Sequence, residues 1–492
     1  MYNSILQFIE KDINEIEKMM WKILEGEADT DDLSATIHGI VLGLGRNLQA
    51  EIYEKVDQEI RDSLIRKEKW TIEQRNEPKK LLDIMGTISF KRTGYKDKQT
   101  EEYIYLLDQV LGLSGHQRIT LGAAAQILEE AVMSSYARGG KHASVTDIVS
   151  RQTVKNLIHD TEIEMPFEVP KEKIKMKYLH IVADEDHVAA QFNEKKGDLK
   201  KGENGQKSNT LQPKLICLYE DIMNESGENS KTPRYALTGK HYFCGIYKGA
   251  RGNEKLWGEV ADYINSNYDT EVLERVYIAG DGAAWIKTGC EVLEKSRFVL
   301  DKFHMMKYVN TSVTHMLDSI DDVKSEIWEA LNGGNKKELK DVYQRILNVT
   351  ESERKKEEVV SALTYFLNNW AGIVIRTAEA GGCWKCCAEG QVSHVLSDRM
   401  SSRPMGWSSL GCDQMAKLRV YKWNGGKIID LLKFQKKQQE KEECRNEQES
   451  LIKELRKRQS GWNYEERFRA SVPGIERREM GWLRDMIGRA LA

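Results

Sequence analysis

The sequence predicts an α/β protein: a core with a mixed five-stranded sheet and flanking helices, an all-helical insertion, and a helical N-terminal region. Three observations support this fold class. Apolar residues recur at three- and four-residue steps from Ile5 to Ile52, as they do in amphipathic helices. Five short apolar runs lie between Tyr178 and Leu300 and have the length of buried strands. Helical patterning then continues from Met305 to Ala380.

The composition indicates a cytoplasmic protein with substantial apolar cores. The chain has 492 residues, of which 40% are hydrophobic and 31% charged, and its net charge is -3. This length predicts about three or four domains, and the near-neutral charge neither supports nor excludes DNA as a partner. Eight cysteines are too few for a secreted disulfide framework. No segment resembles a signal peptide or a membrane span, so we expect no membrane partner.

The first segment of the chain is predicted to be helical up to about Lys69. Two β-rich runs follow, Thr87–Tyr95 and Glu102–Leu106, with a polar turn at Lys96–Thr100 between them. Helical patterning returns from Ile119 to Arg138.

The segment from Ala143 to His159 fits a helix-turn-helix, with Ser144 and Ser150 as the caps of two short helices. The start of the second helix would then contact base edges and phosphates, through Arg151, Gln152 and Lys155. The alternative is a small helical subdomain whose polar residues are simply solvated.

Pro166 and Pro170 mark a linker, after which strands and helices alternate. The predicted strands are Tyr178–Ala183, Leu215–Tyr219, Tyr242–Tyr247, Val276–Ala279 and Phe298–Leu300, and the predicted helices are Asn253–Tyr268 and Ala283–Leu293. Three strands in a row and then two crossovers describe a mixed sheet, in the order of an RNase H-like fold. The lysine-rich segment Asn193–Ser208 is interpreted as a solvated hairpin tip, which is compatible with DNA contact.

These patterns divide the chain into six regions. They are an N-terminal helical region (1–75), a β-hairpin and helix-turn-helix region (76–165), the first part of the core (171–304), the all-helical insertion (305–382), the final core helix (383–426) and a charged helical tail (427–492). The mixed charge of Leu431–Ser460 favours a solvated helix.

Two aspartates directly follow predicted strands. Asp184 ends the first strand and Asp281 the fourth, so neighbouring strands would present both carboxylates at one edge of the sheet. Gly280 and Gly282 flank Asp281 and allow close approach of a backbone or a metal. Converging carboxylates are the ligands that two-metal phosphoryl transfer requires. For either aspartate alone, an ordinary turn residue is the alternative.

Four stretches resemble the ISLre-two class of bacterial insertion-sequence transposases, which are relatives of the Mutator-like group. They are the fragment around Arg92 and Tyr95 with YLLDQVLGL, the run HIVADEDHV, the pair YIAGDGAAWI and LDKFHMMKYV, and the run EGQVSHVLSDRMSSRPMGWS. Together they span roughly Gly86–Ala416 in matching order.

The resemblance implies a DDE transposase, a divalent-metal-dependent nuclease and strand transferase. It implies Asp184, Asp281 and Glu389 as the catalytic carboxylates, although nothing in the composition selects Glu389, and Asp186 and Glu185 lie close enough to Asp184 for a misassignment. The implied cofactor is Mg²⁺, with Mn²⁺ as an alternative. The implied partners are the terminal inverted repeats, target DNA and, in a synaptic complex, further copies of the chain, with the protein associated with the bacterial nucleoid.

The same resemblance assigns supporting roles to three basic residues. His304 forms an i, i+3 pair with Asp301 and would contact a phosphate or hold the scissile strand, or else it is a buried structural histidine. Arg399 and Arg403 would clamp phosphates beside Glu389. Trp407 would stack on a base or simply pack in the core.

The three clustered cysteines, Cys383, Cys386 and Cys387, raise the possibility of a zinc site. A second cysteine pair is missing, so Cys412 or His394 would have to complete the ligand set, and free thiols are the better interpretation.

Two other functions remain open on the sequence. One is a domesticated relative that binds DNA without cutting it, and the other is an RNase H-like nuclease that acts on branched DNA.

Overall fold

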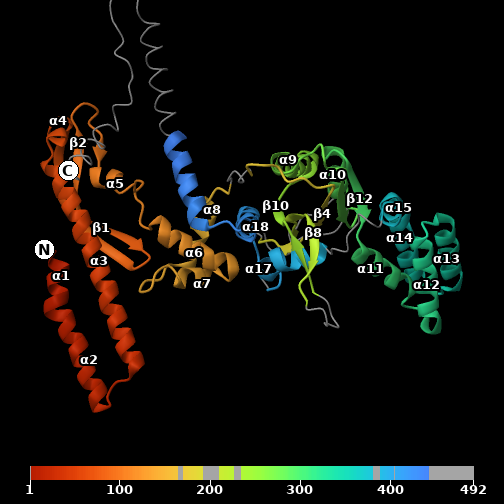
Figure 1. Ribbon diagram of the computed structural model, residues 1–492, viewed down its shortest axis with the longest axis horizontal. Helices are drawn as coiled ribbons and strands as arrows, with labels where there is room; N and C mark the ends of the chain where they lie inside the picture. The colour runs from red at the N-terminus through yellow and green to blue at the C-terminus, as the bar shows by residue number, and fades with distance from the viewer. Residues whose placement is uncertain are drawn as a thin grey trace, which may run out of the picture. The chain divides into compact units, whose positions relative to one another are not determined.

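The computed structural model describes residues 2–163, 170–191, 210–226, 234–379, 388–403 and 405–442. The chain forms two compact units, one of Met1–Leu157 with Ile428–Ala492 and one of Ile158–Lys427. Figure 1 labels many of the helices and strands of each unit. Among the described residues, no helix has both the length and the apolar character needed to cross a bilayer.

The first unit begins with helices, as the periodicity predicts. They are α1 (Asn3–Gln7), the π-helical turn η1 (Phe8–Asp12), α2 (Ile13–Glu25), α3 (Thr30–Asp62) and α4 (Leu64–Lys69). Gly26 ends α2 with a left-handed φ of 75°, and Asp29 and Asp32 form a capping box at the start of α3. Helix α3 lies beside α1 and α2, so this part of the unit is a helical hairpin.

A three-stranded antiparallel sheet follows, in the order β1 (Trp70–Asp83), β2 (Gly86–Asp97) and β3 (Tyr103–Ile104). Strands β2 and β3 and the turn between them were predicted, but β1 was not, and the region boundary at residue 75 is wrong because it cuts this strand. β1 lies at the edge of the sheet, where Pro78 and charged side chains are tolerated, so its sequence lacks the alternation of a central strand.

The predicted helix-turn-helix is confirmed only in its second half. Helix α8 (Arg151–Asp160) is present, and the Ser150 hydroxyl accepts the Thr153 N–H at its start. Residues 143–150 form no helix. Instead, the Ser144 hydroxyl accepts the Asp147 N–H, and the Asp147 carboxylate accepts the Thr87 N–H at 2.8 Å. These side-chain bonds satisfy the local backbone and tie the segment to the β-hairpin, so they compete with a helix.

The other helices of the first unit are α5 (Leu106–Val110), α6 (Leu121–Met133), α7 (Tyr136–Lys141) and a helix over 428–442. This last helix begins the charged tail and belongs to the first unit, where Ile428 and Leu431 are buried and the Ile428 N–H bonds Glu129. The rest of the tail, the loop Asn193–Ser208 and the linker residue Pro166 lie outside the described residues.

The second unit contains the predicted mixed five-stranded sheet. Its order is β10 (His241–Gly245), β7 (Lys214–Tyr219), β4 (Tyr178–Glu185), β11 (Arg275–Gly280) and β12 (Ser296–Leu300). The β10–β7 and β7–β4 pairs are antiparallel, whereas β4–β11 and β11–β12 are parallel. Two short ribbons were not predicted, β5 (Val188–Ala189) with β6 (Thr210–Leu211) and β8 (Asp221–Asn224) with β9 (Tyr235–Thr238).

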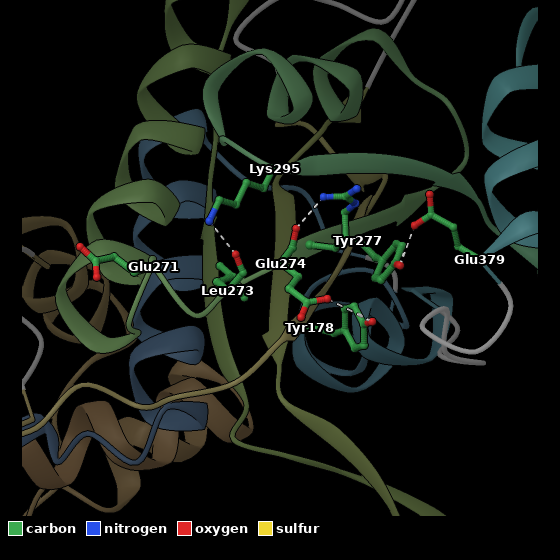
Figure 2. A pocket seen from close by; sticks show the side chains of 8 residues that line it. Tyr178, Glu271, Leu273, Glu274, Tyr277, Lys295 and Glu379 are labelled. Atoms are coloured by element: carbon green, nitrogen blue, oxygen red, sulfur yellow. Dashed lines mark hydrogen bonds between the residues drawn. The ribbon is translucent and has the colours of Figure 1, made fainter.

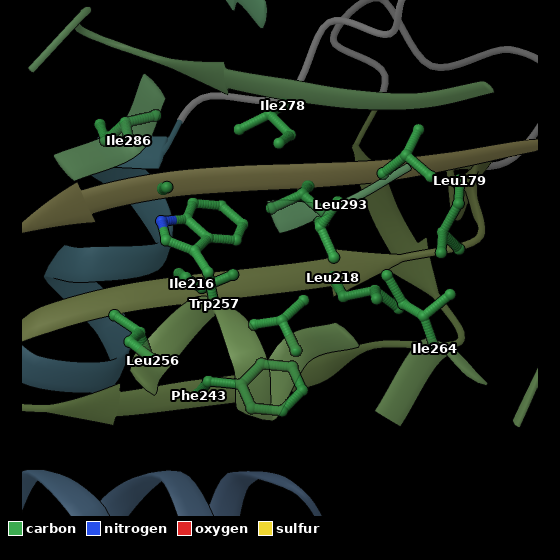
Figure 3. Close-up of a cluster of buried hydrophobic side chains, with 14 of the residues drawn as sticks. Leu179, Ile216, Leu218, Phe243, Leu256, Trp257, Ile264, Ile278, Ile286 and Leu293 are labelled. Atoms are coloured by element: carbon green, nitrogen blue, oxygen red, sulfur yellow. The ribbon is translucent and has the colours of Figure 1, made fainter. Parts of the chain in front are cut away.

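One face of this sheet packs against α9 (Gly249–Asn267) and α10 (Ala284–Val292). Alternate residues of the strands enter the apolar cluster seen in Figure 3, which includes Leu179, Ile181 and Ala183 of β4 and Val276 and Ile278 of β11. Side chains alternate along a strand, so the intervening residues face the opposite side of the sheet.

That opposite side receives the C-terminal elements of the unit, which are α16 (Ala388–Val392), the π-helical turn η3 (Ser393–Ser397), α17 (Asp398–Met400) and α18 (Ser409–Trp423). α16 packs on β4 and β7, and α18 packs on β10. Tyr242, which alternates with the core residue Phe243, donates its hydroxyl to Gln391 of α16 at 2.8 Å.

An all-helical segment separates β12 from α16, as the sequence predicts. It comprises α11 (Lys302–Val313), the 3-10 turn η2 (Leu317–Ser319), α12 (Ile320–Asn332), α13 (Lys336–Val349), α14 (Glu353–Asn368) and α15 (Trp370–Ala378). These helices form a bundle (Figure 1). They share their own apolar cluster, which contains Ile327, Leu339, Tyr343 and Phe366. α15 packs against β12 and joins this bundle to the edge of the sheet.

A pair of helical glycines tests the packing between α9 and α10. A Cβ at Gly289 would lie 2.7–2.8 Å from the buried Trp257 ring, whereas a Cβ at Gly258 meets nothing within 4 Å. We expect Gly289→Ala to lower the free energy of unfolding by about 1–3 kcal/mol through overpacking. Gly258→Ala should raise it by about 0.5–1 kcal/mol. Urea unfolding of the two variants measures this, and equal effects would contradict the packing described here.

Buried His180 predicts a pH dependence of stability. It stacks between Tyr219 and Tyr277, and burial lowers its pKa to about 4, although the charge of Asp221 opposes this. Because the unfolded pKa is about 6.5, the unfolded chain binds this proton first, so stability falls as the pH drops from about 6.5 to 4, by up to about 3 kcal/mol. His180→Phe should flatten this slope in urea titrations, whereas His38→Phe at an exposed position should leave it unchanged.

Candidate functional site

Asp184 and Asp281 lie on the same face of the sheet, on neighbouring parallel strands. Ala279 of β11 pairs with Val182 of β4. Asp281 lies two residues after Ala279, and Asp184 lies two residues after Val182. Both therefore point away from α9 and α10, toward the side on which α16 packs. The strands approach closely here, since a Cβ at Gly280 would lie 2.8 Å from the Ala183 carbonyl oxygen. The expectation that one sheet edge presents both carboxylates is met.

Glu389 is brought to this face by α16, although it lies more than a hundred residues beyond Asp281 in the sequence. Burial raises the pKa of Asp184 to about 7, and the negative charges of Asp281 and Glu389 add to this effect. The Glu185 N–H, which Asp184 accepts at 2.9 Å, and the charge of His304 act in the opposite direction. The four side chains of Asp184, Asp281, Glu389 and His304 thus share one electrostatic environment.

The two acidic neighbours of Asp184 have other partners. Glu185 accepts a hydrogen bond from the Trp285 indole N–H. Buried Asp186 accepts the Ser401 hydroxyl with both carboxylate oxygens, at 3.1 and 2.9 Å. The Asp186–Ser401 bond links the end of β4 to the segment that follows Glu389. The charge of Asp184 interacts with those of Asp281 and Glu389.

His304 and Asp301 form the predicted pair at the start of α11. His304 Nδ1 lies 3.2 Å from the Asp301 carboxylate, and the Asp301 N–H donates to the Gly280 carbonyl at 2.9 Å. The hydrogen bond with Asp301 raises the pKa of His304, and Asp184 and Asp281 raise it further against the effect of burial. Asp301 thus anchors the histidine ring to the strand that leads to Asp281.

A π-helical turn directly follows the helix that carries Glu389. A π turn leaves backbone carbonyls without their usual helical partners. The buried guanidinium of Arg419 in α18 donates to two of them, at Val395 and at His394, the latter at 2.9 Å. This contact fixes α16 and η3 to α18. No sequence pattern singled out Arg419, because its role depends on carbonyls more than twenty residues away.

The turn after β11 is held by two further residues that the sequence did not reveal. The Tyr365 hydroxyl of α14 donates to the Asp281 carbonyl at 2.7 Å. Asn369 lies beside Gly282, whose φ of 92° suits glycine. Within the turn, the Asp281 carboxylate accepts the Ala283 N–H at 2.8 Å. The contacts of Tyr365 and Asn369 come from the helical insertion, whose periodicity predicts only its apolar core.

The predicted phosphate-binding role of Arg399 does not fit its position. Arg399 is only 4% exposed, and its guanidinium lies over the Trp407 ring, 5.1 Å from the centroid. Trp407 is itself buried and donates its indole N–H to Met400, so the packing alternative holds for this residue. Arg403 is exposed, as a phosphate contact requires, and its role stays a prediction.

The other predicted DNA contacts, Arg151, Gln152 and Lys155, lie in the first half of α8. Arg151 and Gln152 are exposed and Lys155 is half-buried, so the first two at least are accessible. These three residues belong to the first unit, whereas the carboxylates of the candidate site belong to the second.

Cys383, Cys386 and Cys387 lie outside the described residues. Cys412 is a buried free thiol, and burial raises its pKa to about 12, which disfavours the thiolate that zinc requires. Within the described ranges, no three or more His, Cys, Asp or Glu side chains stand in ligating geometry for a metal. The carboxylates of the candidate site therefore share one environment without forming a closed ligand set.

A cavity of about 740 Å³ lies at the opposite end of the sheet, where β4 and β11 begin (Figure 2). Its lining includes the acids Glu271, Glu274 and Glu379 and the bases Arg275 and Lys295. Arg275 donates to the Glu274 carbonyl, and Lys295 donates to the Thr270 and Leu273 carbonyls. The excess of acids and the engagement of both bases make this cavity a poor site for a nucleic-acid phosphate. The carboxylates at the other ends of the same strands remain the stronger candidate.

Comparisons with known proteins give the family of the chain. A model described as an uncharacterised protein family, UPF0236, matches residues 26–438. A UPF0236 protein of Caldanaerobacter subterraneus subsp. tengcongensis is 37% identical over 418 residues, covering 85% of this chain and 84% of that protein. A second UPF0236 protein from the same strain is 36% identical over 410 residues, covering 83% of this chain and 81% of that protein. The name of this second protein joins eleven designations.

Among solved structures, a chain of the Drosophila P element transposase strand transfer complex matches with a TM-score of 0.20 and 11% identity, over 64% of this chain and 83% of that one. This similarity is too low to support any conclusion about fold or activity. The family match, by contrast, extends over most of the sequence. The chain belongs to the UPF0236 family.

Proposed function

We propose that this protein is a DDE-type DNA transposase, which cleaves DNA at the ends of an insertion sequence and joins the 3′-ends to target DNA. The observation that supports the proposal is that three acids from distant parts of the chain share one electrostatic environment. Asp184 and Asp281 share one face of the sheet, and the charge of Glu389 acts on Asp184.

The topology of the second unit supports an RNase H-like core. Numbered along the chain, the five strands have the order 3-2-1-4-5, with the first three antiparallel and the last two parallel to the first. The all-helical segment lies between the fifth strand and the helix with Glu389. This is the arrangement expected from the resemblance to insertion-sequence transposases.

The side chains at the site suit a hard divalent cation. Asp184, Asp281 and Glu389 offer only carboxylate oxygens, which Mg²⁺ and Mn²⁺ prefer. Bound there, a pair of such ions would activate the attacking oxygen and stabilise the leaving oxygen of a phosphodiester. A cation would also relieve the repulsion among the acids around the buried Asp184.

The chain's own residues supply orientation at this site. Asp301 engages Nδ1 of His304 and leaves Nε2 as the nitrogen available to a phosphate oxygen. Asp186 and Arg419 hold the Glu389 segment against β4 and α18. Strand transfer replaces one phosphodiester with another, so the reaction needs no nucleotide-binding loop.

A further observation from the relatives supports mobility. The name of one relative joins eleven designations in a single strain. Such a name is expected for a protein that is encoded at many places in one genome. Mobile elements multiply within a genome in this way, whereas a gene for a housekeeping nuclease is not expected in many copies. The proposed DNA partners are therefore the ends of the element and its target, joined by two or more copies of the chain.

We predict that Asp184→Asn, Asp281→Asn and Glu389→Gln each lower Mg²⁺-dependent strand transfer by more than about 100-fold, because each removes a charged ligand. The assay uses the full-length protein and the DNA that flanks its gene, with Asp262→Asn on the exposed side of α9 as a control. The control should transfer strands like the wild type.

Three outcomes would contradict the proposal. Binding to the flanking DNA without any cleavage by the wild type would indicate a domesticated binding protein. Cleavage of branched DNA without preference for the flanking ends would indicate a nuclease. Full activity of Asp281→Asn would remove the proposed site itself.

A further inference from the structure

Helix α14 of the insertion contacts the backbone of the turn that carries Asp281. The Tyr365 hydroxyl donates to the Asp281 carbonyl at 2.7 Å, and the Tyr365 ring stacks on Tyr308 of α11 with 3.9 Å between centroids. The hydroxyl is therefore held from two sides, by its own helix and by a stacked ring. It bonds a main-chain atom of the candidate catalytic residue and leaves the Asp281 carboxylate free to act.

The second contact is made by Asn369, which ends α14. Asn369 is only 6% exposed, and its side-chain N–H₂ donates to the Tyr365 carbonyl at 3.0 Å. Its Oδ1 is buried without a hydrogen-bond partner, and it would lie 2.3 Å from a Cβ at Gly282. The side chain thus rests directly against the residue after Asp281. The buried Oδ1 thus faces the Gly282 backbone, and the Asn369 side chain packs against this turn.

The turn needs such support because its own sequence makes it loose. Gly280 and Gly282 flank Asp281, and Gly282 has a φ of 92°. Glycine gives the backbone more freedom than any other residue, and fixing that freedom costs conformational entropy. Within the described part of the chain, the Asp281 carboxylate restrains the turn through the Ala283 N–H, a bond that a metal ion would compete for. A restraint on the backbone keeps the turn in place while the carboxylate is used.

We propose that Tyr365 and Asn369 are positioning residues, through which the helical insertion fixes the Asp281 turn and so sets the affinity of the site for a divalent cation. This inference rests on the proposed function and extends it. It makes the insertion a part of the catalytic centre. A displacement of α14 relative to the sheet would therefore also displace Asp281.

The structure offers a matched control for Tyr365. Tyr343 of α13 is a buried tyrosine of the same helical bundle, and its hydroxyl bonds the Ser312 hydroxyl at 2.9 Å. Tyr343→Phe and Tyr365→Phe each remove one hydroxyl from that bundle, but only the second removes a bond to the Asp281 turn. An effect on the insertion alone would appear in both variants.

The first measurement uses metal-free, full-length protein and follows hydrogen exchange of the peptide over 281–286. The loss of one hydrogen bond predicts about fivefold faster exchange there in Tyr365→Phe, and no change in Tyr343→Phe. Asn369→Ala should have a similar local effect. These readings do not require any enzymatic activity.

The second measurement is calorimetric titration of the same proteins with Mn²⁺. We expect about fivefold weaker binding in Tyr365→Phe and wild-type affinity in Tyr343→Phe. Faster exchange in both tyrosine variants would overturn the proposal, since it would reveal general loosening of the bundle. Unchanged exchange and Mn²⁺ affinity in both Tyr365→Phe and Asn369→Ala would overturn it as well.

The two proposals fail in different ways. If Asp281→Asn binds Mn²⁺ as tightly as the wild type, the proposed function loses its metal site. The positioning of the turn is then still decided by hydrogen exchange, because that comparison is made without metal and without DNA.

Discussion

The parallel pairing of β4 with β11 is the constraint on which the candidate site depends. Each aspartate lies two residues after a member of the Val182–Ala279 pair, so Asp184 and Asp281 lie on the same face of the sheet. A shift of one residue in either strand would turn its aspartate toward the apolar cluster under α9 and α10. Packing of that cluster, with Trp257 and Ile278 fully buried, therefore fixes the register and with it the chemistry.

The other contacts around the site are polar bonds that attach distant segments of the chain to this part of the second unit. The Asp301 N–H bonds the Gly280 carbonyl and brings His304 with it. Ser401 bonds Asp186, and Arg419 bonds the carbonyls of the π turn, so the chain that follows Glu389 is held at two points. Tyr365 reaches back from the insertion to Asp281. The candidate site is thus assembled from one sheet and several polar attachments.

Buried polar groups concentrate on the side of the sheet that faces these attachments. His180, Asp184, Asp186, Asp301 and Arg419 are all nearly inaccessible, whereas the face toward α9 and α10 is apolar. Burying charges without compensation is unfavourable, and proteins retain such groups where they serve a function. The raised pKa of Asp184 is the electrostatic expression of this arrangement, and burial is its main cause.

The sequence by itself determined the elements whose signals are local. The periodicity of the insertion, the five strands, and the two aspartates that follow strands were all readable, because apolar alternation and turn residues act over a few positions. Edge strand β1 escaped, since an edge tolerates charged residues and Pro78. The tertiary structure alone decided which acids meet, why Arg399 is buried, and which residues support the site. Tyr365, Asn369 and Arg419 act on atoms tens of residues away or on backbone carbonyls, and neither kind of contact leaves a trace in the local pattern.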